Sequence, residues 1–277
     1  MIAKGPITKL ANKDKIPAQT IERDYVLAHL CAEIGSQGEL NLIFKGGTFL
    51  RLCCFDNYRY SADLDFSAID GFSRRQALDL VVTAATACRK RLEMPELAVT
   101  ADDGTTAWIK YVGPLQSKPR RLKLDISDTE LVESHRRAEL QQRWPDLPDG
   151  ASIEGYTLEE IGAEKLRCVA ERVQCRDLFD LDALLESGHL DPLEIWALYL
   201  RKAENDRRNG KQRVPSHEWA SRFDERMDSY RTRWHNELSE YVSKPARFDD
   251  VERRTRRRLS DLLTPRRGGR HNRNERG

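Results

Sequence analysis

A short apolar run in the first fifth of the chain ends at two glycines. Residues 40–44 read LNLIF and are followed by Lys45 and then by Gly46, Gly47 and Thr48. An apolar run of this length between glycines is typical of a buried β-strand, and the next residues, TFLRLCCF, predict a short helix. Glycines at such a turn let the backbone approach a phosphate group, which the free N–H groups of a helix start attract. A tight turn that needs a positive φ is the alternative interpretation.

A second strand is predicted by YSADLDFS, residues 60–67, because polar and apolar residues alternate in it. Alternation places Ser61, Asp63 and Asp65 on one face of that strand and the apolar residues on the other. Two neighbouring carboxylates repel each other unless a cation neutralises them, and ligand sets made of oxygen alone suit Mg²⁺ or Mn²⁺. The pattern therefore predicts a metal site, with a solvated strand edge as the alternative.

Two helices and three more strands are predicted in the first half of the chain. Apolar residues at helical spacing indicate helices over Ile21–Ile34 and Ser73–Leu92, with Ser73 as the N-cap of the second. Alternating and β-branched residues predict strands in LAVTADD, TAWIKYVG and RLKLDIS. In RLKLDIS the apolar residues take one face, which leaves Lys123 and Asp125 on the other. Asp125 is thus a third candidate carboxylate.

Length and composition restrict the class of protein. A chain of 277 residues suits two domains, and 39% apolar residues suffice for their cores. The chain has no apolar run of about 18 residues and begins without the apolar segment of a signal peptide, so we expect a cytoplasmic protein without membrane contact. Its six cysteines form no C-x-x-C pair or zinc pattern and are expected to be reduced thiols. P-loop and Rossmann phosphate-binding motifs are also absent from the sequence.

The second half of the chain is predicted to be helical. A polar segment with two prolines, residues 143–152, marks the expected domain boundary. Helical spacing dominates from Thr157 on, and Thr157 with Glu160 has the pattern of a capping box. Residues 253–277 form a basic end with ten arginines and two acids. From residue 263 this end is expected to be disordered, and it suits either an RNA partner or a solubilising role.

The order of these motifs resembles that of the polymerase-β-like nucleotidyltransferases. The resemblance implies an α+β fold in three parts: an N-terminal nucleotidyltransferase domain with a mixed sheet and helices (residues 1–145), a C-terminal helical domain that completes the active site (150–262), and a disordered arginine-rich tail (263–277). It also implies that a triphosphate lies on the glycine turn and that two metal ions lie on the three aspartates. Such an arrangement suits in-line phosphoryl transfer.

Four longer segments are similar to one family within that superfamily. IERDYVLAHL, FKGGTFLRL, RYSADLDFS and LEEIGAEKLRCVAERVQCRDLFDL resemble the nucleotidyltransferase AbiEii/AbiGii toxin family, which includes the MenT-type toxins, over about residues 20–200. The resemblance implies the toxin of a type IV-like toxin–antitoxin or abortive-infection system, which transfers nucleotides from an NTP to RNA. For MenT-type members the acceptor is the 3′ end of tRNA, so that translation is blocked. The implied partners are RNA and a cognate antitoxin protein, and the implied cofactor is Mg²⁺ or Mn²⁺.

The same resemblance implies roles for individual residues. The residues implied to bind the nucleotide are Gly46, Gly47, Thr48, Ser61, Lys165, Arg172, Arg176 and Asp177. Those implied to hold metal are Asp63, Asp65 and Asp125, and the set implied to be catalytic is Asp63, Asp65, Asp125, Lys165 and Asp180. One departure from the family pattern is Ala62, which stands where an acidic residue is usual but points away from the metal face.

The helical motif also has a geometric interpretation. In one continuous helix Lys165, Arg172 and Arg176 lie within about 20° of one line, and Asp180 lies about 60° away from it. Like charges aligned in this way repel each other, which favours a triphosphate opposite them. The alternative is that both arginines form salt bridges to nearby aspartates such as Asp177.

Two other functions compete with this interpretation. The enzyme could transfer nucleotides to a protein or to a small molecule, and labelled NTP offered to RNA, protein and metabolites would distinguish these acceptors. A catalytically inactive fold could instead serve as an RNA-binding or partner-binding module. The presence of Asp63, Asp65 and Lys165 argues against the inactive module.

Overall fold

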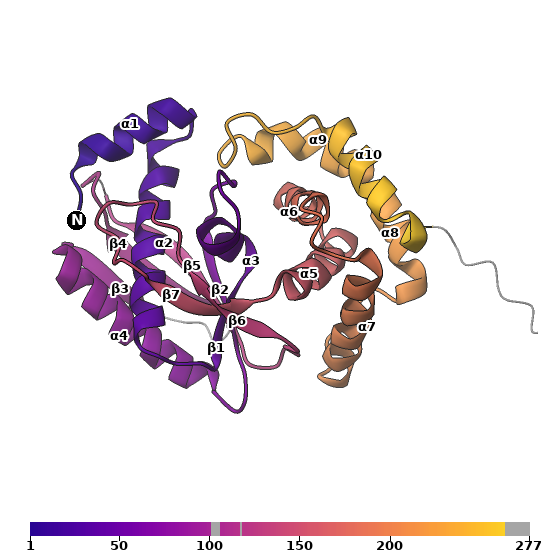
Figure 1. The fold of residues 1–277 in the computed structure, drawn as a ribbon, viewed down its shortest axis with the longest axis horizontal. Coiled ribbons are helices and arrows are strands. Elements are labelled where there is room, and N and C mark those ends of the chain that lie inside the picture. The colour runs from indigo at the N-terminus through magenta and orange to yellow at the C-terminus, as the bar shows by residue number, and fades with distance from the viewer. Residues whose placement is uncertain (101–105, 117, 264–277) are drawn as a thin grey trace, which may run out of the picture.

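The structure, a computed structural model, describes residues 1–100, 106–116 and 118–263, and it consists of a mixed β-sheet with a helical half beside it (Figure 1). The strands are β1 (Leu42–Lys45), β2 (Asp63–Ala68), β3 (Glu96–Thr100), β4 (Thr106–Val112), β5 (Arg120–Ser127), β6 (His135–Glu139) and β7 (Ser152–Tyr156). The helices are α1 (Lys4–Asp14), α2 (Ala18–Ser36), α3 (Gly46–Phe49), α4 (Arg74–Leu92), α5 (Leu158–Glu171), α6 (Cys175–Glu186), α7 (Pro192–Arg208), α8 (Trp219–Glu225), α9 (Met227–Leu238), α10 (Phe248–Arg258) and α11 (Ser260–Leu263). The tail predicted to be disordered lies outside the described residues from residue 264 on.

The strands form one sheet in the order β3-β4-β5-β2-β1-β7-β6. At its centre β1 pairs with β2 in antiparallel fashion, and β2 pairs with β5 in parallel. The predicted alternation in β2 is confirmed, because Leu64 and Phe66 are buried while Asp63 and Asp65 stay partly exposed. Strand β5 shows the same alternation, with its apolar residues buried. The aspartates of both strands therefore share one face of the sheet.

Helices α2 and α4 pack against each other and against the sheet (Figure 1). The predicted N-cap of α4 is confirmed as a full capping box. The hydroxyl of Ser73 accepts the backbone N–H of Gln76 at 3.3 Å, and the side chain of Gln76 accepts the N–H of Ser73 at 2.9 Å. Both groups thereby satisfy N–H donors that the first helical turn leaves free.

The sheet continues past the segment in which the sequence analysis expects the domain boundary, residues 143–152. Strand β7 follows that segment and pairs in parallel with β1, with Gly155 opposite Phe44. Strand β6 then pairs with β7 as the edge of the sheet. The sheet therefore runs to Tyr156, and the helical half begins directly after it.

Helix α5 begins at Thr157, whose hydroxyl accepts the N–H of Glu160 at 3.4 Å. The carboxylate of Glu160 does not complete the predicted capping box in the described structure. It accepts the backbone N–H groups of Glu133 and Ser134 instead, at 2.7 Å and 3.1 Å. The start of α5 is thereby tied to the loop between β5 and β6.

The continuous helix assumed for the three aligned cations is interrupted. Helix α5 ends at Glu171 and α6 begins at Cys175, because Arg172 adopts an extended conformation with φ −142° and ψ 159°. The predicted alignment of Lys165, Arg172 and Arg176 along one helix face is therefore wrong. Their convergence has to come from how the two helices pack.

Candidate active site

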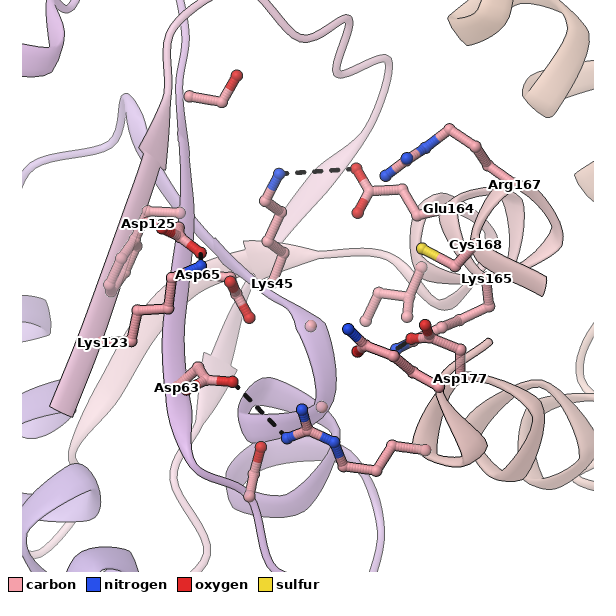
Figure 2. A pocket seen from close by; sticks show the side chains of 18 of the residues that line it. Lys45, Asp63, Asp65, Lys123, Asp125, Glu164, Lys165, Arg167, Cys168 and Asp177 are labelled. Carbon is pink, nitrogen blue, oxygen red and sulfur yellow. Dashed lines mark hydrogen bonds and ion pairs between the residues drawn. The ribbon is translucent and has the colours of Figure 1, made fainter. Parts of the chain in front are cut away.

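A cavity of about 570 Å³ lies between the sheet and helices α5 and α6 (Figure 2). Of the residues predicted from the sequence, those that line it are Gly46, Gly47, Ser61, Asp63, Asp65, Asp125, Lys165, Arg172, Arg176 and Asp177. Thr48 and Asp180 are buried nearby and do not line the cavity. The structure thus brings ten predicted residues together around one space, although they come from six separate parts of the chain.

Three carboxylates on neighbouring strands form the sheet side of the cavity. Asp63 and Asp65 lie on β2, and Asp65 is opposite Asp125 of β5 in the strand register. The pKa of Asp65 is raised to about 6, chiefly by burial and then by the negative charge of Asp63, against the opposing charge of Lys45. The ionised form of Asp65 is therefore destabilised unless positive charge is added beside it.

The three carboxylates are candidate ligands of a divalent cation. Among the described residues, no three acidic, histidine or cysteine side chains converge closely enough to hold a metal ion as they stand. Cationic side chains contact them instead: Lys123 Nζ lies 2.5 Å from Asp125 Oδ2, and Arg176 Nη1 lies 3.6 Å from Asp63 Oδ2. The donor set still fits Mg²⁺, which is commonly bound by one or two carboxylates together with substrate phosphates. The raised pKa of Asp65 is consistent with a carboxylate that a cation would stabilise.

The two glycines of the turn make room for side chains of the site. Gly46 has a φ of +77°, and a Cβ atom there would lie 2.6 Å from Oδ2 of Asp65. A Cβ atom at Gly47 would lie 2.1 Å from Nη2 of Arg59. The turn therefore needs glycine for its backbone conformation at the first position and for close approach at both.

Thr48 links the glycine turn to the strand that carries the D-x-D pair. Its Oγ1 donates a hydrogen bond to the backbone carbonyl oxygen of Asp63 at 2.5 Å, and the residue is 1% exposed. Thr48 thus holds the backbone of Asp63 in place. Direct contact of its hydroxyl with a nucleotide stays a prediction.

Asp180 lies at the centre of a buried cluster next to the glycine turn. Its carboxylate accepts Nε–H and Nη2–H of Arg59, both at 2.6 Å, and the hydroxyl of Tyr58 at 2.6 Å. Lys165 Nζ lies 2.8 Å from Asp180 and 2.8 Å from Asp177. Burial alone raises the pKa of Asp180, but Arg59 and Lys165 outweigh it and hold the pKa below its ordinary value. Asp180 therefore positions two cations, Arg59 and Lys165, that do line the cavity.

The cations of the helical half reach the cavity from three places. Lys165 comes from α5, Arg172 from the connection between the helices, and Arg176 from α6. Arg172 pairs with Asp177, with Nε and Oδ2 2.8 Å apart, so the salt-bridge alternative is confirmed for this residue. Arg176 pairs across the cavity with Asp63. The packing of two short helices, rather than one helix face, brings the positive charge together.

One end of the cavity was missed by the sequence analysis. Lys45 is hydrogen-bonded to Glu130 and lies 3.8 Å from Glu164, toward which it points in Figure 2. Arg59 and Arg167 also line the cavity. Lys45 and Arg59 could have been predicted from the sequence, because each directly precedes a motif of the sequence analysis. Lys45 precedes the glycine pair, and Arg59 precedes the predicted strand of residues 60–67. Glu130 and Glu164 could not have been predicted, since only tertiary packing brings them to Lys45.

A mixed sheet that presents three carboxylates beside a glycine turn, opposite cations from a helical half, defines a nucleotidyltransferase fold. The family comparison agrees: the family described as nucleotidyl transferase AbiEii toxin, type IV TA system, matches residues 30–254. The protein belongs to the AbiEii nucleotidyltransferase toxins of type IV toxin–antitoxin systems. The resemblance found in the sequence is thereby confirmed, and membership of this family implies an antitoxin as a partner.

Solved structures show the same fold. The protein is similar to MenT4, the nucleotidyltransferase toxin Rv2826c from Mycobacterium tuberculosis H37Rv, with 20% identity and a TM-score of 0.71 over 95% of this chain and 90% of that chain. It is also similar to JHP933 from Helicobacter pylori, with 17% identity and a TM-score of 0.53 over 90% of this chain and 93% of that chain. The predicted α+β nucleotidyltransferase fold is confirmed. A search of curated proteins gives no match.

None of the helices in the described residues is both long enough and apolar enough to cross a membrane.

Proposed function

We propose that this toxin is a metal-dependent nucleotidyltransferase that transfers nucleotides from an NTP to RNA. We further propose that its acceptor is the 3′ end of tRNA, so that the modification blocks translation. The observation that carries the proposal is that three sheet carboxylates and Lys165 line one cavity from opposite sides (Figure 2). Arg172 and Arg176 of the helical half line the same cavity. Carboxylates facing cations in this way suit a triphosphate bound together with a divalent cation.

The lining residues divide into two groups. Those that would bind the triphosphate are Gly46, Gly47, Ser61, Lys165, Arg172 and Arg176. Those that would hold Mg²⁺ or Mn²⁺ are Asp63, Asp65 and Asp125. When bound, such an ion polarises the reacting phosphate and stabilises the charge that develops on the leaving group. The helical half supplies the cations, so both halves of the protein are needed for a complete site.

The position and the charge of Lys165 suit it to bind a phosphate group. Its ammonium group contacts Asp177 and Asp180 at 2.8 Å each, and it lines the cavity. Burial by itself lowers the pKa of Lys165, but the two aspartates outweigh it and raise the pKa above its ordinary value. Lys165 therefore stays charged at any physiological pH and in a fixed position, which reduces the reorganisation that substrate binding requires.

The proposed transfer breaks a phosphoanhydride bond of the NTP and forms a phosphoester bond to the acceptor. The hydroxyl oxygen of the acceptor attacks the α-phosphorus, and the bond from that phosphorus to the bridging oxygen breaks. Pyrophosphate leaves with the bonding electrons, and the hydroxyl proton passes to water. A cation held by Asp63 would repel the guanidinium group of Arg176, which would then be free to contact the triphosphate.

We propose that, within the basic end, residues 266–277 bind RNA. The five arginines of residues 253–258 lie on α10 and form ion pairs, such as that of Arg254 with Asp182 at 2.6 Å. Their charge is therefore partly neutralised within the protein. The five arginines of residues 266–277 lie outside the described residues, and we assign the contact with RNA phosphates to these.

Labelled nucleotides test the proposed function. The full chain is incubated with each α-labelled NTP and Mg²⁺ in the presence of tRNA, total protein and a metabolite extract. We expect label in tRNA and none with the Asp63→Ala variant. Label in protein or in a metabolite would replace RNA by another acceptor, and the absence of label from every fraction would support an inactive binding module.

A further inference from the structure

One face of the sheet beside the active site is open to solvent. In β4, Ala107, Ile109 and Tyr111 are fully buried, whereas Trp108 between them is 37% exposed. Trp108 lies opposite Lys123 in the register of β4 and β5, so both side chains are on the face that carries the aspartates. An exposed tryptophan at this place contributes little to the core.

Trp108 differs from the other four tryptophans of the chain. Trp219 and Trp234 are buried, and each donates its indole N–H to a backbone carbonyl. Trp144 and Trp196 pack against other aromatic rings. Within the part of the chain that the structure describes, Trp108 has neither a ring contact nor a hydrogen bond from its indole group. Its ring is therefore available to an external partner.

The strand register places Trp108 close to the catalytic carboxylates. Trp108 is opposite Lys123 of β5, and Lys123 is opposite Asp63 of β2. Because neighbouring strands are about 4.8 Å apart, Trp108 lies about 10 Å from Asp63 along the sheet. Thr106, the next residue on this face of β4, donates a hydrogen bond to Asp125 at 3.1 Å and lines the cavity. The open face is thus continuous with the active site.

Beyond the aspartates this face carries Lys110, Arg121 and Lys123, and Lys123 is already paired with Asp125. Lys110 lies opposite Arg121 in the register of β4 and β5. Lys110 pairs with Glu96 at 2.8 Å, whereas the exposed Arg121 has no ion pair or hydrogen bond through its side chain to any described residue. Like charges directly opposite each other destabilise a sheet. A bound anion would remove this cost.

We propose that this face, the β4 platform (Trp108, Lys110, Arg121 and Lys123), binds the single-stranded 3′ end of the RNA acceptor. A base stacks on the indole ring of Trp108, and Arg121 with Lys110 contacts the adjoining phosphates. Stacking accepts any base because every base has a π-face, while the positive border selects a polyanion. The inference rests on the proposed function, and it gives the acceptor a path that ends at the carboxylates of β2.

Binding of a single-stranded RNA oligonucleotide to the full chain, in the absence of NTP, tests the stacking contact. We expect Trp108→Ala to weaken binding at least about fivefold, the lower end of the loss for one stacked base, and Trp108→Phe to keep most of the affinity. Leu200→Ala is a matched control, because Leu200 is a 36% exposed apolar side chain on α7 in the helical half. It should bind as the wild type does. Equal affinity of the wild type and a folded Trp108→Ala variant would overturn the platform.

The charge contact is tested by the salt dependence of the same binding. Arg121→Glu should weaken binding and make its dependence on salt shallower. Arg75→Glu is the control, because Arg75 is an exposed arginine on α4, away from the open face. Equal losses in both variants would show unspecific attraction and contradict the inference. A blunt-ended RNA hairpin should bind more weakly than the single strand and be insensitive to Trp108→Ala.

The failure of the platform and the failure of the proposed function are distinguishable. If the wild type labels RNA and Trp108→Ala does so with an unchanged KM for RNA, the proposed function is supported and the β4 platform is wrong. If the wild type labels protein and binds no single-stranded RNA, the proposed function is wrong and the exposed face would bind a protein acceptor. The expected result is a raised KM for RNA with an unchanged KM for NTP.

Discussion

Arg176 of α6 and Asp63 of β2 form an ion pair across the active-site cavity, with Nη1 and Oδ2 3.6 Å apart. The two residues have different proposed ligands, since Asp63 would hold a divalent cation and Arg176 a triphosphate. Their side chains are 25% and 33% exposed, so the pair contributes little to the stability of the protein. The contact instead shows that a cation of the protein already balances a carboxylate that a metal ion would neutralise.

Arg176→Ala should change metal binding and nucleotide binding in opposite directions. Without the competing guanidinium, Mn²⁺ should bind somewhat more tightly in the absence of NTP, by up to about 1 kcal/mol, the usual upper value for an exposed pair. NTP should bind about tenfold more weakly, because a charge-assisted contact to phosphate is lost. Isothermal titration of each ligand measures both effects. Weaker binding of Mn²⁺ to the variant would contradict this role of Arg176.

Asp63→Ala should abolish nucleotide transfer while leaving the fold intact. Removal of a charge that stabilises the transition state typically lowers kcat by a factor of about 100–1000, and the side chain is partly exposed, so little stability is lost. Asp79→Ala, at an exposed position on α4, is the matched control. Transfer rates and thermal unfolding of both variants are compared with the wild type. Normal transfer by Asp63→Ala would show that the site is misplaced.

Asp65→Asn should stabilise the chelator-treated protein at neutral pH. The folded-state pKa of Asp65, about 6, lies above its ordinary value of 3.8, so the folded protein holds this proton more tightly than the unfolded chain does. Stability therefore falls as pH rises between these values, by up to about 3 kcal/mol in total. Asparagine removes this loss, so the variant should be more stable than the wild type at pH about 7.5 and equal to it near pH about 3, below the unfolded-state pKa.

Urea unfolding of Asp65→Asn and wild-type protein at both pH values measures this difference. Added Mg²⁺ should stabilise the wild type more than the variant, because the ion binds the carboxylate. A difference that is the same at both pH values would show that the charge of Asp65 is not its cause.

Asp180→Asn should destabilise the protein and weaken NTP binding together. The variant leaves Arg59 and Lys165 buried without a full countercharge, which typically costs about 3–5 kcal/mol. The depressed pKa of Asp180 means that its ionised form contributes stability above the unfolded-state pKa, and that this contribution is lost as pH falls through the lower folded-state pKa. The wild type should therefore lose its advantage over the variant in acid. Chemical unfolding at pH about 7 and about 3 measures this, with the exposed Asp149→Asn as a control that should change neither quantity.

The elements that carry the carboxylates can be predicted from the sequence alone. Alternation in residues 60–67 and 120–127 is a local property of the chain, and it correctly predicted which side chains of β2 and β5 share a face. The apolar run before Gly46 likewise predicted the strand, turn and helix around the glycine pair. These predictions held because strand periodicity depends on neighbours two residues apart.

How the helical half packs against the sheet could not be predicted from local sequence patterns. The pairing of Arg176 with Asp63 and the enclosure of Asp180 by Arg59 both depend on contacts between segments far apart in sequence, 121 residues in the second case. Trp108 is a similar case. The alternation of β4 that sets its face is local, but its exposure depends on which face of the sheet the helices cover. Packing and charge pairing between distant segments have no local periodicity. For that reason the sequence predicted ten residues that line the cavity but, apart from the pair of Arg172 with Asp177, not their partners.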